Sequence, residues 1–419
     1  MIFIAYLVFV LSAINLIRMA FFLIGSDVHD IIRSRRHGQK ELQEYNPLVT
    51  VIVPAHNEEK TLLRNIKSVA ASTYKYIELI IVNDSSTDAT KRIACKFQRE
   101  YFGVKVVDVQ VRGKAKALNL GLKYANGTLV MCLDADSMLS PNAIENAVKE
   151  FRDENLVALS ANVKILADKG FLNLLQRVEY LLNYQMKKAE VFAHIQYIIG
   201  GVGSMYRLTE LKEVGLYDTD TITEDIDLSM KIIEFYGKDK KIGYSPNVVV
   251  YTEAVLSLPD LYKQRIRWKY GRYQSFFKRR KLFFSTRYNF LLSWIYLPYA
   301  LYAEFSYLLE PLILGYVLYL IIQVNDYGTL ITCIIVFVTF TTFQMLGASN
   351  GYNLVERLKL SFLSILLMVP MYLVVYYEYL VSVVGLISIK KIMSERKKGT
   401  FNCEWNPVER SGSTTFIGG

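Results

Sequence analysis

Apolar stretches near both ends of the chain constrain its fold more than any other feature of the sequence. Residues 2–24 are apolar except for Arg18, and most of the chain from 288 to 389 is apolar as well. A helix of about 20 apolar residues is long enough to cross the hydrocarbon core of a bilayer. We therefore expect an N-terminal transmembrane helix at 1–25 and C-terminal transmembrane helices within 288–389. The C-terminal segments are 288–323, 329–349 and 360–389, and Pro298 and Pro311 are potential breaks that leave the number of helices open.

Basic residues beside these apolar segments predict the topology. The formal net charge is +10, and basic clusters at 33–40, 263–281 and 390–398 all lie next to apolar stretches. Such clusters mark the cytoplasmic face of a membrane protein. We therefore expect a cytoplasmic linker at 26–46, a basic cytoplasmic tail at 390–419 and a multi-pass location in the plasma membrane. No nucleic-acid-binding motif accompanies the charge, which argues against nucleic acid as a partner.

Residues 47–257 show a different pattern, in which short apolar runs alternate with longer amphipathic stretches. This alternation is typical of an α/β domain. In an open α/β sheet, ligands bind at the carboxyl ends of the strands, so the polar residues after the apolar runs are the candidate site. The expected strands are 48–53, 77–82, 104–109 and 129–133, and the expected helices between them are 59–71 and 87–101.

Two further stretches have helical patterns. Residues 258–287 combine aromatic side chains with many Lys and Arg, which predicts an amphipathic helix at a membrane interface. Residues 171–199 repeat apolar side chains at a spacing of three and four. An ordinary packing helix and a membrane contact both explain this second pattern.

Acidic residues follow the first two expected strands. Glu58 lies in the run Pro-Ala-His-Asn-Glu-Glu after the first strand, and Asp84 lies in Asn-Asp-Ser-Ser after the second. A carboxylate at such a position can accept hydrogen bonds from a nucleotide base or ribose. It can equally cap the next helix, and these residues alone do not decide between the two roles.

Asp134 and Asp136 follow the strand at 129–133 and form an Asp-Ala-Asp motif. Two neighbouring carboxylates repel each other, and a cation that also contacts a diphosphate relieves that repulsion. Oxygen ligands favour Mg²⁺ or Mn²⁺ over zinc. The four cysteines and four histidines show neither CxxC nor HExxH spacing, so the sequence indicates no disulfide framework and no zinc site.

Three other motifs carry candidate chemistry. Lys114 and Lys116 lie in a Gly-Lys-Ala-Lys run, where one or both neutralise a diphosphate or remain solvated. Asp225, within Thr-Glu-Asp at 223–225, is a candidate base that takes a proton from an acceptor hydroxyl, while Glu224 and Asp227 also suit the first turn of a helix. In the run Gln-Arg-Ile-Arg-Trp at 264–268, arginine suits a departing diphosphate and the indole suits a sugar face, although a basic face on anionic lipid explains the run as well.

In this order, with apolar segments on both sides, these motifs resemble the processive family 2 glycosyltransferases, the group of the cellulose, chitin, hyaluronan and poly-N-acetylglucosamine synthases. The resemblance covers roughly residues 45–280 by motif, and its most specific parts are the runs at 222–229 and 264–268. Within the group the chain is most similar to the bacterial poly-β-1,6-N-acetylglucosamine synthases. Those relatives often carry two leading spans, whereas one is visible here, so the exact product stays open.

The resemblance implies a GT-A catalytic domain on the cytoplasmic side, with a central, mostly parallel sheet and helices on both faces. It implies metal-dependent, inverting transfer from a UDP-sugar, such as UDP-N-acetylglucosamine, to a growing polysaccharide that is exported through the membrane. Whether an accessory export protein takes part is left open. The implied roles are as follows. Asp225 is the base, Asp134 and Asp136 bind the metal, and Trp268 and Glu224 contact the acceptor. The implied contacts with the nucleotide or diphosphate come from Glu58, Asp84, Lys116, Asp134, Gln264, Arg265 and Arg267.

The resemblance extends to two further segments, and two other functions remain as alternatives to the predicted one. Residues 201–204 resemble a loop beside the acceptor, and 405–410 resemble a C-terminal Trp and Arg element that covers the nucleotide in some relatives. One rival is a transferase that adds a single sugar to a lipid carrier. The other is a non-catalytic transporter or receptor with a nucleotide-sensing domain, for which the intramembrane acids Glu304, Glu310 and Glu378 would be the support.

Overall fold

A mixed sheet of eight strands forms the centre of the α/β region. The computed structural model describes residues 2–37, 45–325, 327–348 and 353–397, and within them the strand order is β3-β2-β1-β4-β7-β6-β8-β5. The predicted strands are confirmed as the first four of the chain. The bounds are β1 Val49–Ala55, β2 Ile77–Asp84, β3 Val104–Val109, β4 Leu129–Cys132, β5 Ser137–Leu139, β6 Leu156–Ile165, β7 Ser204–Arg207 and β8 Lys241–Thr252.

The sheet is mixed rather than mostly parallel, which corrects the sequence-based expectation. Strands β1 to β4 pair with one another in parallel, and β6 pairs with β8 in parallel. Strand β7 is antiparallel to both β4 and β6, and β5 is antiparallel to β8. Ser204, the first residue of β7, pairs with Cys132, the last residue of β4. The chain therefore enters β7 at the edge where β4 ends, and it has to run in the opposite direction.

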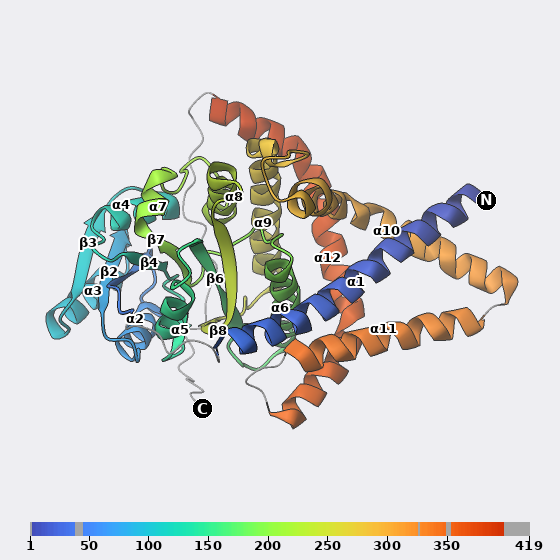
Figure 1. The fold of residues 1–419 in the computed structure, drawn as a ribbon, viewed down its shortest axis with the longest axis horizontal. Helices are drawn as coiled ribbons and strands as arrows, with labels where there is room; N and C mark the ends of the chain where they lie inside the picture. The colour runs from blue at the N-terminus through green and yellow to red at the C-terminus, as the bar shows by residue number, and fades with distance from the viewer. Residues whose placement is uncertain (1, 38–44, 326, 349–352, 398–419) are drawn as a thin grey trace.

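Helices cover both faces of the sheet, as expected (Figure 1). On one face Ile66 of α2, Phe97 of α3 and Ile144 of α5 belong to the same buried apolar cluster as Val51 and Val53 of β1. On the other face α4, α7 and α8 pack against the alternate positions of the same strands. The bounds are α2 Leu62–Ala70, α3 Thr90–Glu100, α4 Lys114–Lys123, α5 Ala143–Glu150, α7 Leu208–Glu213 and α8 Glu224–Tyr236.

The N-terminal helix α1 (Ile2–His37) extends beyond the predicted boundary at residue 25 and through part of the segment predicted as a linker. It packs along α6 (Phe171–Phe192). Asp30 accepts a 2.5 Å hydrogen bond from the buried Lys188 of α6, and Arg33 reaches Glu150 and Ser245 of the sheet region. These long-range contacts hold the polar part of α1 after residue 25 against the rest of the protein. The local sequence pattern predicted a linker there.

Helix α9 (Leu258–Lys278) lies between the sheet and the C-terminal helices (Figure 1). Its N-terminus is capped by Ser257, whose hydroxyl accepts a hydrogen bond from the Asp260 N–H at 3.3 Å. The helix ends at Lys278 rather than at the predicted residue 287, because Arg279 leaves helical geometry where it turns toward a group of acidic side chains. A short 3₁₀ turn η1 (Arg280–Leu282) and a π-helix η2 (Leu291–Tyr296) follow.

Three long apolar helices end the described chain: α10 (Leu297–Val324), α11 (Tyr327–Ala348) and α12 (Leu354–Lys397). Pro298 lies in the first turn of α10 and Pro311 lies inside that helix, so neither breaks it into two. Among the described residues, one helix, Leu330–Ala348, is long and apolar enough to cross a membrane, and Leu354–Leu367 with Pro370–Tyr377 forms a pair bent by 54° that also qualifies when taken together. These helices qualify by length and composition alone, and the multi-pass topology stays a prediction.

Candidate active site

A lysine links two acidic motifs at the carboxyl edge of the sheet. Asp134 follows β4, and Lys114 is the first residue of α4. The Lys114 Nζ lies 2.6 Å from a carboxylate oxygen of Asp134 and 3.2 Å from one of Glu224, at the start of α8. The Asp-Ala-Asp and Thr-Glu-Asp motifs, 90 residues apart in the sequence, therefore converge on one cation, as the predicted site requires.

Asp225 lies in the same cluster. One of its carboxylate oxygens accepts a 2.7 Å hydrogen bond from the Gly201 N–H, and the other accepts one of 2.9 Å from the Ile226 N–H. A methyl group built on Gly201 would lie 3.3 Å from both the Asp225 carboxylate and the Lys114 Nζ. The predicted loop at 201–204 thus begins directly beside the predicted base.

Burial and charge set the ionisation of these groups. Burial, with the neighbouring Glu224 carboxylate, raises the pKa of Asp225 to about 6, although Lys114 opposes the shift. Burial and the nearby Asp136 raise the pKa of Asp134 as well. Burial alone would lower the pKa of Lys114, but Asp134, Glu224 and Asp225 outweigh it and raise that pKa. Lys114 therefore stays charged, and Asp225 has a pKa suited to a base near neutral pH.

Two lysines lie in the first turn of α4, and the sequence-based prediction gave the diphosphate contact to Lys116. The two residues are two positions apart on α4, so they cannot face the same side of the helix. The contacts with Asp134 and Glu224 belong to Lys114. The predicted role of Lys116 on the diphosphate stays a prediction.

Asp84 is fully buried at the end of β2 and holds the loop that leads into α4. One carboxylate oxygen accepts hydrogen bonds from the N–H groups of Val111 and Arg112, both at 3.0 Å, and the other accepts one of 2.8 Å from Gly113. Asp84 thereby fixes the residue that precedes Lys114. These hydrogen bonds do not test the predicted contact of Asp84 with uridine, which stays a prediction.

The Glu58 carboxylate accepts a 2.5 Å hydrogen bond from the hydroxyl of Thr61, the residue before α2, and the Glu58 backbone carbonyl accepts hydrogen bonds from the Thr61 and Leu62 N–H groups. The Glu58 N–H donates to the Thr90 hydroxyl at 2.7 Å, which joins the loop after β1 to the start of α3. Both roles that the sequence left open for this position, cap and nucleotide ligand, are compatible with a side chain at this edge of the sheet.

Asp134 and Asp136 suit a divalent cation by their chemistry. Asp136 accepts a 2.9 Å hydrogen bond from the Ser137 hydroxyl. Within the described chain no group of three or more His, Cys, Asp or Glu side chains is placed to hold a metal. Mg²⁺ is commonly held by one or two carboxylates together with substrate phosphates, so a pair of aspartates fits a cation that arrives with a diphosphate.

The Gln-Arg-Ile-Arg-Trp run lies on α9, and α9 packs directly on the loop before Asp225. A Cβ on Gly271 would lie 2.0 Å from the Thr223 hydroxyl oxygen, so only glycine permits this approach. Gln274 also accepts a 2.9 Å hydrogen bond from the Ile222 N–H and donates one to the Asp220 carbonyl. Helix α9 is therefore the support on which the Thr-Glu-Asp motif is built.

The side chains of that run have different surroundings. Arg265 pairs with Glu179 of α6 and lies 4.7 Å over the Trp268 ring, an arrangement that orients the indole. Gln264 is buried, whereas Arg267 is partly exposed and makes no recorded hydrogen bond or ion pair within the described residues. No direct contact joins these side chains to the carboxylates of Asp134 or Asp225 in that part of the chain.

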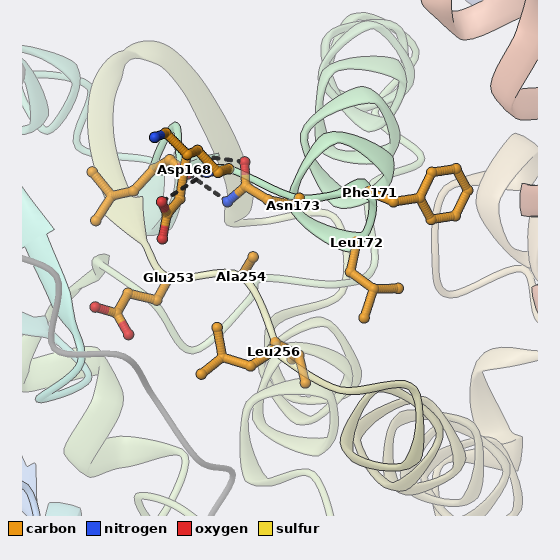
Figure 2. Close-up of a pocket in the computed structure, with 11 residues that line it drawn as sticks. Asp168, Phe171, Leu172, Asn173, Glu253, Ala254 and Leu256 are labelled. Atoms are coloured by element: carbon orange, nitrogen blue, oxygen red, sulfur yellow. Dashed lines mark hydrogen bonds between the residues drawn. The ribbon is translucent and has the colours of Figure 1, made fainter.

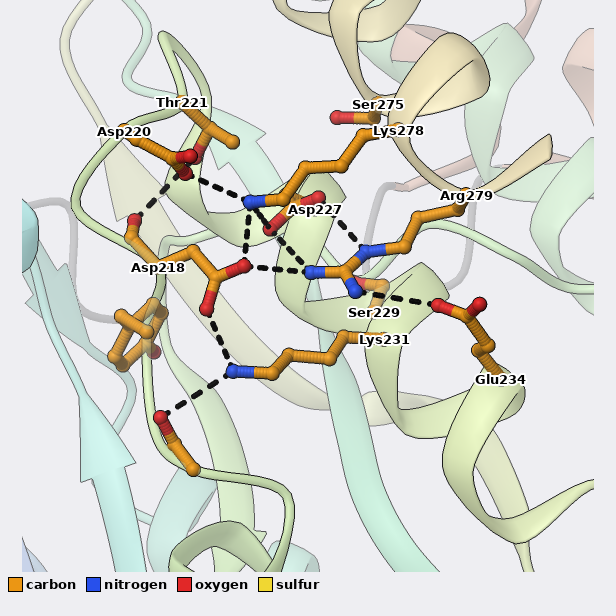
Figure 3. A network of polar contacts seen from close by, with 12 residues as sticks. Asp218, Asp220, Thr221, Asp227, Ser229, Lys231, Glu234, Ser275, Lys278 and Arg279 are labelled. Carbon is orange, nitrogen blue, oxygen red and sulfur yellow. Dashed lines mark hydrogen bonds and ion pairs between the residues drawn. The ribbon is translucent and has the colours of Figure 1, made fainter. Parts of the chain in front are cut away.

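A buried ion network that the sequence did not predict fixes the end of α9 to α8 (Figure 3). Asp227 is fully buried and accepts hydrogen bonds from Lys278 at 3.1 Å and from Arg279 at 2.9 and 3.0 Å. Asp218 contacts both cations and also Lys231; burial alone would raise its pKa, but these hydrogen bonds lower it. The paired basic residues at the end of the predicted helix were the one sequence signal for this network.

A pocket of about 210 Å³ lies between the start of α6 and the segment after β8 (Figure 2). Leu172, Val255 and Leu256 form its apolar wall, and Asp168 and Glu253 are acidic side chains on its lining. Glu253 pairs with Arg64, and the Arg64 guanidinium also donates to the Asp136 carbonyl at 3.5 Å. The pocket therefore adjoins the second aspartate of the Asp-Ala-Asp motif.

One of the three predicted intramembrane acids has a clear structural partner. Glu304 of α10 is buried and pairs with Arg272 and Lys269 of α9. The side chains of Glu310 and Glu378, the tail element at 405–410 and most of the basic tail lie outside the described residues. Glu304 thus joins α9 to α10, which is a structural role and not evidence for transport.

Comparison with known proteins relates this chain to glycosyltransferases. Residues 50–215 match the family model described as "Glycosyl transferase family 2". Poly-beta-1,6-N-acetyl-D-glucosamine synthase from Staphylococcus epidermidis is 34% identical over 226 residues, which is 53% of this chain and 54% of the relative. The protein of the same name from Staphylococcus aureus strain COL is 32% identical over 240 residues, 57% of each chain. The chain thus spans about half the length of the curated relatives it matches.

A solved structure shows the same fold. The mannosyltransferase from Pyrobaculum calidifontis, in complex with GDP-Man and Mn²⁺, aligns with a TM-score of 0.52 and 22% identity, covering 84% of this chain and 97% of that one. The α/β region therefore has a GT-A-like fold around its mixed sheet, and the predicted family resemblance is confirmed.

Proposed function

We propose that this chain, an enzyme with a family 2 glycosyltransferase domain, is a membrane-bound inverting transferase that moves N-acetylglucosamine from UDP-N-acetylglucosamine to a growing polysaccharide. The observation that carries the proposal is the convergence of Lys114, Asp134, Glu224 and Asp225 at one edge of the sheet. The printed name of the relatives from two staphylococcal species supports the choice of sugar.

Asp225 is the proposed general base. An inverting transfer forms the bond between the acceptor oxygen and the anomeric carbon while the bond to the diphosphate breaks, and the base removes the acceptor proton. With a pKa of about 6, Asp225 is ionised in roughly ten of eleven molecules at pH 7. The N–H groups of Gly201 and Ile226 hold one lone pair of each oxygen and orient the carboxylate toward the acceptor.

The departing UDP carries the negative charge that develops in the reaction, and positive groups stabilise it. Lys114 lies closest to the acidic motifs, its side chain is partly buried, and it is the proposed contact of the diphosphate. Asp134 and Asp136 are the residues that would hold Mg²⁺ or Mn²⁺, which when bound neutralises the diphosphate oxygens. Asp84 acts indirectly by fixing Val111 to Gly113 ahead of Lys114.

Helix α9 is the proposed acceptor-binding element. The indole of Trp268 offers a flat apolar face for a sugar ring, and the Arg265 guanidinium above it fixes its orientation. Arg267, with no partner among the described residues, is free to contact the diphosphate. Because α9 contacts both Thr223 before the base and Glu304 of α10, the acceptor end lies between the chemistry and the apolar helices.

This arrangement also supports a location at the plasma membrane, with the catalytic domain in the cytoplasm and the product exported through the apolar helices. Transfer of one sugar to a lipid carrier uses the same site chemistry and is the principal alternative. A non-catalytic sensor does not need a base with a raised pKa beside a cation and a metal-binding pair. The finding that Glu304 is an anchor for α9 removes one argument for transport alone.

The experiment that tests the proposal is incubation of the purified, membrane-reconstituted chain with radiolabelled UDP-N-acetylglucosamine and Mn²⁺, followed by size analysis of the product. A polymer that a β-1,6-hexosaminidase degrades is the expected result. Formation of labelled lipid-linked monosaccharide alone would establish the alternative, and no transfer from any UDP-sugar would end the proposal.

A further inference from the structure

An aromatic cluster on the surface lies where the chain passes from α9 to α10. Phe284, Phe290 and Trp294 are 59%, 63% and 41% exposed. Their rings nevertheless contact one another, with centroids 5.5 Å apart for Phe284 and Trp294 and 6.2 Å apart for Phe290 and Trp294. Leu291 and Ile295 extend the same exposed surface. A contiguous apolar surface of this kind in a protein marks an interaction site.

The cluster is held in place by the backbone beneath it. The buried Ser293 hydroxyl donates to the Leu282 carbonyl at 2.5 Å and accepts a 2.9 Å hydrogen bond from the Ser285 N–H. The Phe284 N–H donates to the Ser293 carbonyl at 3.1 Å. In the π-helix η2, Leu292 and Ser293 face inward while Trp294 faces outward. The aromatic surface is therefore a fixed platform and not a loose loop.

Exposed cations precede and follow Phe284 in the chain. Four consecutive basic residues, Lys278 to Lys281, end α9 and form η1. Lys278 and Arg279 turn inward and form ion pairs within the acidic network of Figure 3. Arg280 and Lys281 are exposed and form no ion pair within the described residues. Arg287, also exposed, donates to the Phe235 carbonyl at 3.1 Å and lies beside Tyr288.

We propose that this platform, defined by Phe284, Phe290 and Trp294 with Arg280, Lys281 and Arg287, binds anionic glycerophospholipid headgroups in the leaflet that faces the catalytic domain. Aromatic rings partition to the boundary between headgroups and acyl chains, and Lys or Arg beside them contact lipid phosphates. The next residue after η2 is Leu297, where the apolar helix α10 begins, so the platform lies at the base of a helix that leads into the apolar region.

Charge complementarity decides between occupants. An apolar protein face would satisfy the rings but offer no anion to Arg280 and Lys281. A zwitterionic lipid offers a phosphate only together with its own cation, so it carries no net negative charge to attract them. Anionic lipid satisfies both, and each basic residue near such a surface strengthens binding roughly fivefold. The inference rests on the membrane location in the proposed function, but not on sugar transfer.

Quenching of tryptophan fluorescence tests the proposal in the full chain. The protein is reconstituted in nanodiscs of phosphatidylcholine and phosphatidylglycerol in which one or the other lipid carries brominated acyl chains at equal mole fraction. The difference between the native chain and the Trp294→Phe variant isolates the signal of Trp294. Brominated phosphatidylglycerol is expected to quench Trp294 at least about twofold more than brominated phosphatidylcholine.

Two variants and one salt titration make the test decisive. Arg280→Gln with Lys281→Gln should abolish the preference, whereas Lys96→Gln with Lys123→Gln, the same charge change on α3 and α4, should retain it. In the native chain, raising the salt from about 0.05 M to about 0.5 M should also reduce the preference, because it screens exposed charges. Equal quenching by both lipids would overturn the anionic choice, and no quenching by either would show that the platform faces water or another protein. Sugar transfer measured on the same samples separates a failure here from a failure of the proposed function.

Discussion

The contact between α9 and the Thr-Glu-Asp motif predicts a large effect from a small substitution, Gly271→Ala. The added Cβ would lie 2.0 Å from the Thr223 hydroxyl oxygen, 2.4 Å from its methyl carbon and 2.6 Å from its Cβ, whereas real Cβ contacts are essentially never closer than 3.0 Å. The motif or the helix must therefore move by about 1 Å. Thr223 directly precedes Glu224 and Asp225, so that movement displaces the proposed base.

A misplacement of about 1 Å costs about 100-fold in catalytic rate, or roughly 2.7 kcal/mol in transition-state free energy. We expect Gly271→Ala to lower kcat by about that factor and to change the KM for the UDP-sugar little, because Lys114 and Asp134 are not displaced. The assay is initial-rate transfer of labelled sugar with the donor varied, alongside the Tm of each variant.

A control and a rescue sharpen this test. Gly315→Ala, at a helical glycine with nothing within 4 Å of the added Cβ, should leave kcat unchanged. Thr223→Gly removes all three clashing atoms, and the Thr223 side chain makes no capping hydrogen bond, so the double variant should recover much of the lost rate. A Gly271→Ala enzyme with native kcat, or a double variant no better than the single one, would refute the packing of α9 on the motif.

Two further predictions concern the charges of the site. Lys114→Met should lower kcat by at least about 100-fold, because a buried cation at the carboxylates is lost, while Lys116→Met should stay within about threefold of the native enzyme in the same assay; the reverse order would restore the sequence-based assignment. The ionised form of Asp225 is the active base and its pKa is raised to about 6, so kcat/KM should rise about tenfold per pH unit below pH 6 and level off above about pH 7. Glu224→Gln removes the like charge and should move this inflection to lower pH; an unchanged inflection would assign it to another group.

Local patterns in the sequence predicted the first four strands and the acidic motifs well, because β-rich runs that end in polar residues depend only on neighbouring positions. The order of the later strands was not predictable in this way. Strand β7 has four residues, and its antiparallel direction follows from the path of the chain through α6 rather than from its own side chains.

The roles of residues whose partners lie far away in the chain could not be predicted from local sequence patterns. Asp30 and Arg33 are polar and adjacent to a basic cluster, which is the local signature of a linker, yet both are paired with residues more than 100 positions away. Asp227 suits the first turn of a helix by sequence, but it is a fully buried partner of Lys278 and Arg279. Lys114 and Lys116 lie two positions apart in one Gly-Lys-Ala-Lys-Ala run, and their sequence does not show which of them faces Asp134 and Glu224.

The account depends on Asp225 acting as a base in a site that binds the donor through other residues. The measurement that tests this most directly compares UDP affinity, by calorimetry, with transfer rate in the Asp225→Asn variant. Native-like UDP affinity with transfer lowered about 100- to 10,000-fold is the predicted result. Undiminished transfer in that variant would contradict it.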